Sequence, residues 1–145
     1  MSAIDELYQD LILDHHRHPR NKRPCSGCQH QAHGENPLCG DSINVGLTVD
    51  GERIASASFE GQGCAISQAS ASMMTEAIAG MTVDDALALG ESLRAMMRGE
   101  PPGRDLGDLQ ALEGIARFPV RIKCALLAWT TLVRALDAKG KETSS

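Results

Sequence analysis

A thiol and a carboxylate lie two residues apart in the stretch Asn36-Pro37-Leu38-Cys39-Gly40-Asp41. Residues i and i+2 of an extended backbone point to the same side, so Cys39 and Asp41 could reach one metal ion together. Gly40 between them has no side chain to crowd that ion, and it can adopt backbone angles that other residues avoid. This stretch is therefore the first candidate for a metal site.

Two further cysteines could complete a set of ligands, namely Cys64 in Gly61-Gln62-Gly63-Cys64 and Cys124 in Arg121-Ile122-Lys123-Cys124. Three thiolates and one carboxylate suit tetrahedral zinc or the edge of an iron–sulfur cluster. Arg121 would share a helix face with Cys124, because the two are three residues apart, and it could offset part of the negative charge. From the residues alone an alternative stays open, in which both cysteines are small buried residues and the arginine is solvated.

A second cluster, Cys25-Ser26-Gly27-Cys28-Gln29-His30-Gln31-Ala32-His33, contains a C-x-x-C pair followed by two histidines. This short spacing can hold zinc. All four side chains would crowd nine residues of loop, whereas a zinc finger separates its ligand pairs with a folded insert. We interpret the cluster as a polar loop with redox-sensitive thiols. A disulfide or an auxiliary metal contact stays open for it.

Length and charge limit the class of protein. The 145 residues suffice for one hydrophobic core, and we expect a single domain over residues 1–145 with a polar tail from about Lys139. A formal net charge of −5 argues against a nucleic-acid partner. The sequence has no signal-peptide pattern and no uncharged stretch near the ~20 residues of a membrane span. We therefore expect a cytoplasmic protein without a membrane partner, whose five cysteines are typical of metal ligands or reactive thiols.

Hydrophobic spacing predicts the secondary structure. A first helix should end near His18-Pro19, with a positive charge on its last-turn histidines suiting the helix dipole, and residues 19–38 are interpreted as a loop. Alternating apolar residues at 43–49 and 55–59, joined by Asp50-Gly51, predict an antiparallel hairpin. Further helices are expected over about 66–80, 82–97 and 119–138, with a short helical turn near 106–115.

These elements predict an α+β fold, in which a small antiparallel sheet packs against several helices. The three candidate cysteines would lie at element ends. Cys39 would precede the hairpin, Cys64 would lie between its second strand and a helix, and Cys124 would lie near the start of the last helix. Element ends are places where reactive groups can converge and still meet solvent.

The motifs together resemble the NifU N-terminal/IscU-like family of iron–sulfur cluster assembly proteins, and most of all its SufU branch. The likeness covers nearly the whole chain. Two features favour SufU. Lys123 stands directly before Cys124, where IscU-type scaffolds usually carry a histidine, and the segment from about Leu89 to Gly114 is similar to the SufU insertion. The motifs that carry the resemblance are Leu7-Tyr8, Ile12-Leu13-Asp14-His15, Pro19-Arg20-Asn21, Asn36-Pro37-Leu38-Cys39-Gly40-Asp41, Phe59-Glu60-Gly61-Gln62-Gly63-Cys64-Ala65-Ile66-Ser67, Ala69-Ser70-Ala71-Ser72-Met73-Met74 and Phe118-Pro119-Val120-Arg121-Ile122-Lys123-Cys124-Ala125.

The resemblance implies a SufE/NifU-like fold and a function. Cys39, Asp41, Cys64 and Cys124 would bind Zn²⁺, and Cys39 would accept persulfide sulfur from a SufS-type cysteine desulfurase. Docking of that enzyme would supply a histidine to the zinc and free Cys39, with Arg121 as charge support. The protein would thus be a zinc-dependent, sulfurtransferase-like partner that passes sulfur to an iron–sulfur scaffold or to apo-protein recipients.

Two alternatives stay open. The first is a scaffold that builds a [2Fe–2S] cluster on the same residues and transfers it to apo-proteins. The second is a structural zinc module that only binds a partner. The resemblance assigns no role to Cys25 and Cys28.

Overall fold

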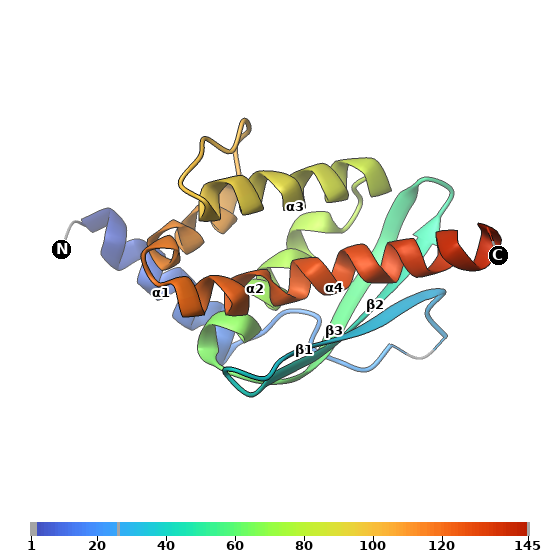
Figure 1. Cartoon of the computed structure of the whole chain (residues 1–145), viewed down its shortest axis with the longest axis horizontal. Helices are drawn as coiled ribbons and strands as arrows, with labels where there is room; N and C mark the ends of the chain where they lie inside the picture. Colours follow the sequence, from blue (N-terminus) through green and yellow to red (C-terminus); the bar gives the residue numbers. More distant parts are fainter. Residues whose placement is uncertain (1–2, 26, 145) are drawn as a thin grey trace.

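The computed structural model describes residues 3–25 and 27–144, and the side chains of residues 8–25 and 27–136. A short three-stranded sheet is flanked by helices that precede and follow it in the chain (Figure 1). The elements in chain order are α1 (Ala3–Arg17), β1 (His30–Asn36), β2 (Asp41–Asp50), β3 (Arg53–Gln62), α2 (Ala65–Ile78), α3 (Val83–Met97), the 3₁₀ helix η1 (Gly107–Arg117) and α4 (Pro119–Ser144).

The sheet is antiparallel throughout, with the strand order β1-β2-β3, and it confirms the predicted α+β class. β2 and β3 form the hairpin that Asp50-Gly51 predicts. Ile43, Val45 and Leu47 are buried, as their alternation indicates. A register shift near Thr48 and Val49 interrupts the pairing with β3. Ala55 is therefore exposed, although the sequence pattern assigned it to the buried face.

The strand β1 lies within residues 19–38, which the sequence predicted to be a loop, so that prediction was wrong there. Its inward positions are occupied by polar or small residues, namely His30, Gly34 and Asn36, and these give no apolar alternation. The strand is stabilised by the close packing of α4 against it, which has no counterpart in the local sequence pattern. A Cβ at Gly34 would collide with the hydroxyl of Thr131 on α4, so glycine is what lets the helix approach the strand.

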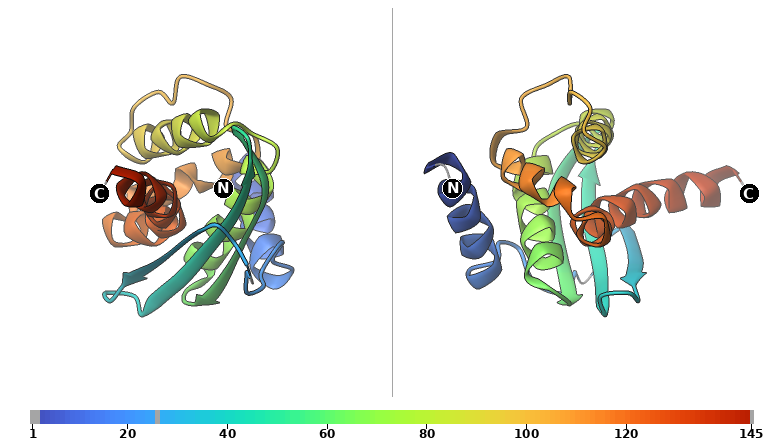
Figure 2. Two further views of the ribbon diagram at one scale, coloured as in Figure 1. Left: turned by 90° about the vertical axis from the view of Figure 1, so that its right-hand side faces the viewer. Right: turned by 60° about the vertical axis from the view of Figure 1, so that its left-hand side comes forward.

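Helices α2 and α4 form most of the core around the sheet. α4 packs against β1 and β2, while α2 packs against β3 and lies next to α1 and α4 (Figures 1 and 2). α2 is buried along almost its whole length, and its serines find partners: the Ser70 hydroxyl donates to the Ala125 carbonyl at 2.6 Å. These contacts fix the start of α4 relative to the start of α2.

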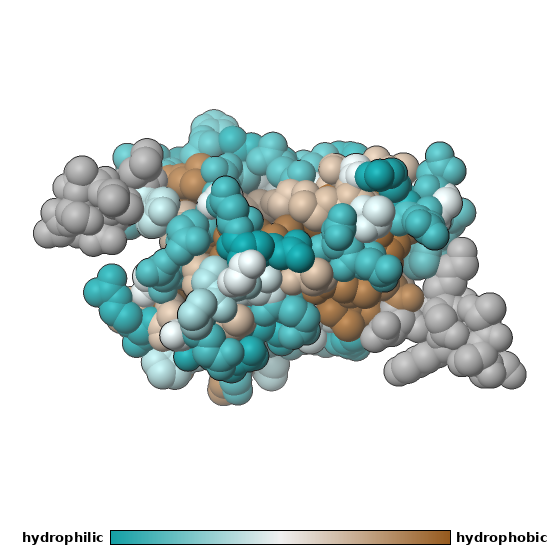
Figure 3. All heavy atoms as spheres, turned by 90° about the horizontal axis from the view of Figure 1, so that it is seen from above, coloured by the Kyte–Doolittle hydropathy of each residue, from teal (hydrophilic) through white to brown (hydrophobic). Residues whose placement is uncertain are grey.

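The remaining helices follow the prediction closely. α3 begins after Thr82, whose side chain accepts a hydrogen bond from the Asp85 amide at 3.1 Å, as a helix cap does. α4 runs on through the segment from Lys139 that we expected to be a tail. Figure 3 looks down on the molecule from the α3 side and shows a mainly hydrophilic surface with local apolar patches. Among the described helices, none is both long enough and apolar enough to cross a membrane.

His15 departs from its predicted role at the helix end. The residue is only 1% exposed, and its Nδ1 lies 2.7 Å from the Ser72 hydroxyl on α2. Burial lowers the pKa of His15 below its ordinary value of 6.5, and the nearby Arg20 lowers it further. His15 is therefore a neutral residue that joins α1 to α2, because helix packing outweighs the attraction of a charge to the helix dipole.

Candidate metal centre

The turn between β1 and β2 presents the first two candidate ligands. Asn36 and Asp41 face each other across the strand pair, and the Cys39 amide donates to the Asn36 carbonyl at 3.2 Å. Gly40 has φ +69°, which confirms the expectation that it adopts an angle other residues avoid. The expectation of an extended backbone was wrong for Cys39, which lies in a tight turn. The turn brings its thiol beside the Asp41 carboxylate all the same.

Asp41 links the turn to the start of α2. Its side chain is 2% exposed, and its Oδ1 accepts a hydrogen bond from the Cys64 amide at 2.8 Å. Cys64 is the residue at which α2 begins, so the carboxylate lies at the positive end of that helix. A Cβ at Gly63 would collide with the Asp41 carboxylate, so this close approach requires glycine.

Cys124 arrives from the second turn of α4 and is 1% exposed. Its thiol donates to the Cys39 sulfur, with the two Sγ atoms 3.0 Å apart. The Asn36 amide nitrogen lies 3.5 Å from the Cys124 sulfur and donates to it. Ligand atoms of Cys39, Asp41 and Cys124 all lie within 4.8 Å of one another, which is close enough for one metal ion.

Cys64 lies at the edge of this group. Its Sγ is 4.0 Å from Asp41 Oδ2, and it also contacts the Cys124 thiol. The structure therefore brings Cys39, Asp41 and Cys124 together as a tight group with Cys64 adjacent. Sequence reasoning missed Asn36 as a partner of the cluster, although it opens the same motif.

The electrostatics of the cluster favour a bound cation. Burial raises the pKa of the Cys124 thiol far above its ordinary value, and its hydrogen bonds with Cys39, Asp41 and Cys64 raise it further. A thiolate in this buried, acidic surrounding is unfavourable unless a positive charge replaces the proton. Three sulfur donors and one carboxylate are ligands that Zn²⁺ accepts, so the residues present fit that ion.

A cleft of about 420 Å³ opens over the cysteines. Arg121 is exposed and lines it together with Cys124, as their spacing on one helix face predicts. Among the described residues no ion pair involves Arg121, so its role as charge support remains a prediction. Two exposed apolar residues, Phe118 and Val120, line the cleft, and a third, Leu38, directly precedes Cys39 in the turn. We call these three residues the apolar rim.

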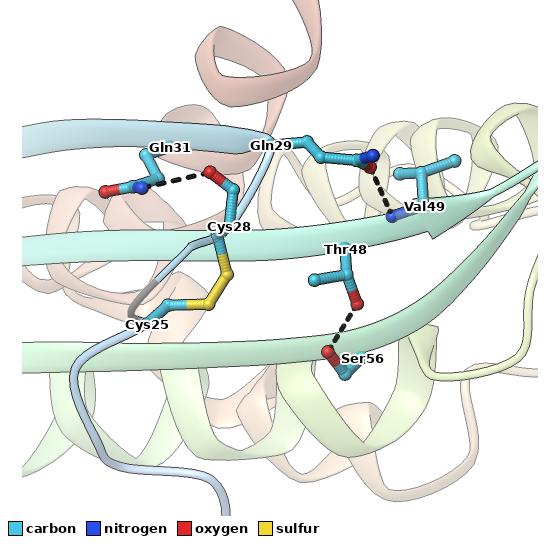
Figure 4. The surroundings of a disulfide bond; sticks show 7 residues. All are labelled: Cys25, Cys28, Gln29, Gln31, Thr48, Val49 and Ser56. Carbon is cyan, nitrogen blue, oxygen red and sulfur yellow. Dashed lines mark hydrogen bonds between the residues drawn. A yellow bond between two sulfur atoms is a disulfide. The ribbon is translucent and has the colours of Figure 1, made fainter.

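The second cysteine cluster does not assemble as a zinc site. Cys25 and Cys28 form a disulfide, the alternative that the sequence left open (Figure 4). Cys25 and His33 line a cleft on one face of the sheet. His30 is buried on the opposite face, near Leu136. The four side chains therefore do not surround one point.

The structure is that of a small α+β protein with a candidate metal centre, a partly buried cluster of thiols and a carboxylate where one end of the sheet meets two helices. The chain belongs to the family described as the NifU-like N terminal domain, which it matches over residues 7–138. That match confirms the resemblance on which the sequence interpretation depends.

Named relatives place this family in iron–sulfur cluster assembly. The chain is 43% identical over 135 residues to the zinc-dependent sulfurtransferase SufU of Bacillus subtilis, covering 92% of this chain and 91% of that protein. It is 38% identical over 138 residues to the iron–sulfur cluster assembly scaffold protein IscU of Streptococcus pyogenes, covering 94% and 86%.

A solved structure shares the fold. It comes from Fervidobacterium islandicum and is provisionally described as an iron–sulfur cluster assembly scaffold protein for the SUF system. The TM-score is 0.84 at 34% identity, with 90% of this chain and 97% of that chain covered.

Proposed function

We propose that this protein is a zinc-dependent sulfur acceptor, which takes persulfide sulfur from a SufS-type cysteine desulfurase for iron–sulfur cluster assembly. One observation carries the proposal: the partly exposed Cys39 is held 3.0 Å from the buried Cys124 and beside Asp41. Similarity to a zinc-dependent sulfurtransferase supports it. We further propose that residues 1–145 act as one domain of this kind.

Zn²⁺ would be held by Cys39, Asp41 and Cys124, with Cys64 as the fourth ligand. When bound, the ion keeps thiolates deprotonated at neutral pH, and a thiolate is the nucleophilic form of cysteine. Asp41 has a second task, because the same carboxylate accepts the Cys64 amide at the start of α2. It therefore fixes the turn that carries Cys39 against the helix that carries Cys64.

Sulfur transfer requires only the chemistry of Cys39. Its thiolate attacks the outer sulfur of the cysteine persulfide on the desulfurase, and a new S–S bond forms at Cys39. The S–S bond within the enzyme breaks, and the enzyme's cysteine leaves as a thiolate. One sulfur atom moves, one S–S bond replaces another, and no external oxidant or reductant is consumed.

Exposure separates Cys124 from the other two cysteines of the cluster. Cys124 is buried on α4, whereas Cys39 and Cys64 are partly exposed and line the cleft. We assign the attack to Cys39, because it lies in a turn between the exposed residues Leu38 and Gly40. Exposed Leu38 precedes Cys39 directly, and Phe118 and Val120 of the apolar rim line the cleft. We propose the apolar rim as the surface on which the desulfurase docks. The sulfur would then pass to an iron–sulfur scaffold or to an apo-protein recipient.

The proposal is tested with purified SufS-type desulfurase and ³⁵S-labelled cysteine. The wild-type chain should acquire label that a reductant releases, and Cys39→Ser should acquire none. Cys25→Ser is the matched control, since its cysteine lies outside the metal cluster, and it should label like the wild type. Labelling of Cys39→Ser at the wild-type rate would show that another residue accepts the sulfur.

A second candidate is the scaffold on which a [2Fe–2S] cluster is built, which the similarity to IscU proteins favours. Lys123 argues for the acceptor, since it is exposed and occupies the place of the histidine usual in scaffolds. Anaerobic reconstitution with iron and sulfide distinguishes the two. A stable, visibly coloured cluster that transfers to an apo-protein would support the scaffold and oppose the acceptor.

A further inference from the structure

The Cys25–Cys28 disulfide is built asymmetrically. Cys25 is partly exposed and lines a cleft of about 480 Å³, whereas Cys28 is buried, with 9% of its surface exposed. Cys25 thus faces a cleft that is open to solvent, whereas Cys28 does not line that cleft. Dithiol pairs that exchange with partners need this arrangement, because an incoming thiolate must reach one sulfur while the other leaves.

The pair rests on the middle strand of the sheet. A Cβ at Gly46 of β2 would lie 2.5 Å from Cys25 Cβ, 3.1 Å from Cys25 Sγ and 3.2 Å from Cys28 Sγ. Figure 4 shows the disulfide crossing in front of the strands. Because Gly46 has no side chain, both sulfurs can pack directly against the backbone of β2.

The loop between α1 and β1 carries the disulfide across the sheet and is bonded on both sides of it. Before the pair, the Arg23 amide donates to the Phe59 carbonyl at 2.8 Å, and the Phe59 amide donates to the Asn21 carbonyl at 3.0 Å. After the pair, the Gln31 side chain donates to the Cys28 carbonyl at 3.1 Å. The loop is therefore anchored without the disulfide, which can open while the loop keeps its path.

The pair is separate from the metal centre. Gly46 lies five residues along β2 from Asp41, a separation of about 17 Å in an extended strand. No sulfur of the pair can attack Cys39 across that distance without refolding of the loop. Any chemistry of Cys25 and Cys28 is therefore independent of the metal centre and takes place at the cleft that Cys25 lines.

We propose that Cys25 and Cys28 form a second thiol site, a reversible dithiol–disulfide couple that exchanges with an external dithiol. A thiolate of the partner attacks Cys25, forms a mixed disulfide with it and releases Cys28 as a thiolate. The partner's second thiolate then attacks the partner sulfur that is bonded to Cys25. The partner closes its own disulfide, and Cys25 is released as a thiolate. Two electrons pass from the partner to the pair, the partner becomes a disulfide, and its two protons end on Cys25 and Cys28.

The cleft fits an exchanging thiolate on one side of the pair. Arg23, His33 and Glu60 line it together with Cys25. The guanidinium of Arg23 is a cation, and a cation in the cleft favours the approach of a negatively charged thiolate. A dithiol is the required class of partner, because its second thiol must resolve the mixed disulfide at Cys25 before the neighbouring Cys28 thiolate closes the original bond again.

The test is a redox titration of the zinc-loaded wild-type chain in mixtures of reduced and oxidised dithiothreitol. Free thiols are trapped with an alkylating reagent and assigned by peptide mapping. Cys25 and Cys28 should gain and lose the label together, reversibly and with the circular dichroism spectrum of the fold intact. A pair that stays oxidised in excess dithiothreitol, or stays reduced at every ratio, would overturn the proposal.

Two single variants test which sulfur is attacked. In Cys28→Ser the free Cys25 should form a mixed disulfide with oxidised glutathione on the order of tenfold faster than Cys28 does in Cys25→Ser. Equal rates, or a faster Cys28, would overturn the assignment. If either variant fails to fold, hydrogen exchange on the wild type replaces this comparison. In that measurement the Arg23 amide, which bonds to the Phe59 carbonyl, should keep its rate on reduction, as do the amides between β2 and β3. Timed alkylation of the reduced wild type then assigns the sulfur: Cys25 should be alkylated on the order of tenfold faster than Cys28. Faster exchange at Arg23, or alkylation of Cys28 first, would overturn the proposal.

Discussion

The sulfur atoms of Cys39 and Cys124 lie 3.0 Å apart, although 85 residues separate them in the chain. One comes from the turn between β1 and β2 and the other from the second turn of α4. The packing of α4 on β1, made close by Gly34, is what brings them together. The position of α4 against the edge strand β1 is therefore what chiefly determines the geometry of the site.

Replacement of Asp41 should weaken the metal site. Asp41→Asn keeps an oxygen that can accept the Cys64 amide, but it loses the charged ligand, and we expect zinc affinity to fall about 10-fold to 100-fold. Asp41→Ala also loses that hydrogen bond and should destabilise the fold by about 1 kcal/mol more. Zinc content after purification and the rate of release to a chromogenic chelator measure the effect.

Asp50→Ala provides the matched control, because Asp50 is exposed at the other end of the same strand. It should retain zinc like the wild type. If Asp41→Asn and Asp50→Ala held zinc equally well, Asp41 would be no ligand, and its carboxylate would serve the start of α2 alone.

The sequence indicated most of the residues that come together in the candidate site, because they lie at element ends that leave strong local signals. Asp50-Gly51 predicts the hairpin, and the hydrophobic spacing predicts a helix over about 82–97. Both predictions are confirmed. The motif around Cys39 and Asp41 marks the place of two candidate ligands. The contact between the Cys124 and Cys39 sulfurs depends on packing between elements that are distant in sequence. No local sequence pattern encodes such packing.

The strand β1 and the role of His15 could not be predicted for the same reason. β1 turns His30, Gly34 and Asn36 inward, and such residues are typical of loops until a helix packs on them. His15 looks like a charge for a helix end, but Ser72 on α2 meets it in the interior. In both cases tertiary packing outweighed a local preference.

Gly63→Ala should loosen the site without removing a ligand. The new methyl group would collide with the Asp41 carboxylate, which must move away from the Cys64 amide. We expect zinc affinity to fall about 10-fold, as when a group that orients a ligand is disturbed. Competition with a chelator of known affinity measures the loss.

Gly80→Ala is a control for Gly63→Ala, because nothing lies within 4 Å of a Cβ at Gly80. Its positive φ should still cost about 1 kcal/mol of stability. Zinc affinity should stay at the wild-type value in this variant. An equal fall in both variants would attribute the effect to general destabilisation instead of the Asp41 carboxylate.

Leu38→Ser should weaken docking of the desulfurase. Leu38 is 70% exposed beside Cys39, and loss of a buried leucine side chain from an interface costs about 1.5–3 kcal/mol, or roughly 10-fold to 150-fold in affinity. Leu13→Ser is the control, since Leu13 is an exposed leucine on α1. Titration calorimetry with the desulfurase compares them. A larger loss with Leu13→Ser would place the docking surface on α1.

The stability of the fold should depend on pH through His15. Its pKa is lowered in the folded state, so the unfolded chain binds the proton first when the pH falls. The stabilisation is complete above the unfolded pKa of about 6.5 and is lost progressively below it, toward the folded pKa. Arg20 opposes protonation and Glu76, whose carboxylate lies 3.7 Å from Nε2, favours it, but burial is the larger effect.

Denaturant unfolding of His15→Gln and His16→Gln between pH 7.5 and pH 5 measures this dependence (about the range over which histidine titrates). His16 is exposed on the same helix turn, so its variant should keep the wild-type dependence. His15→Gln should lose about 1 kcal/mol or more at pH 7.5, as its hydrogen bond to Ser72 is disturbed, and should then respond less to acid. If its unfolding free energy fell with pH as steeply as that of the wild type, His15 would not be the group that titrates.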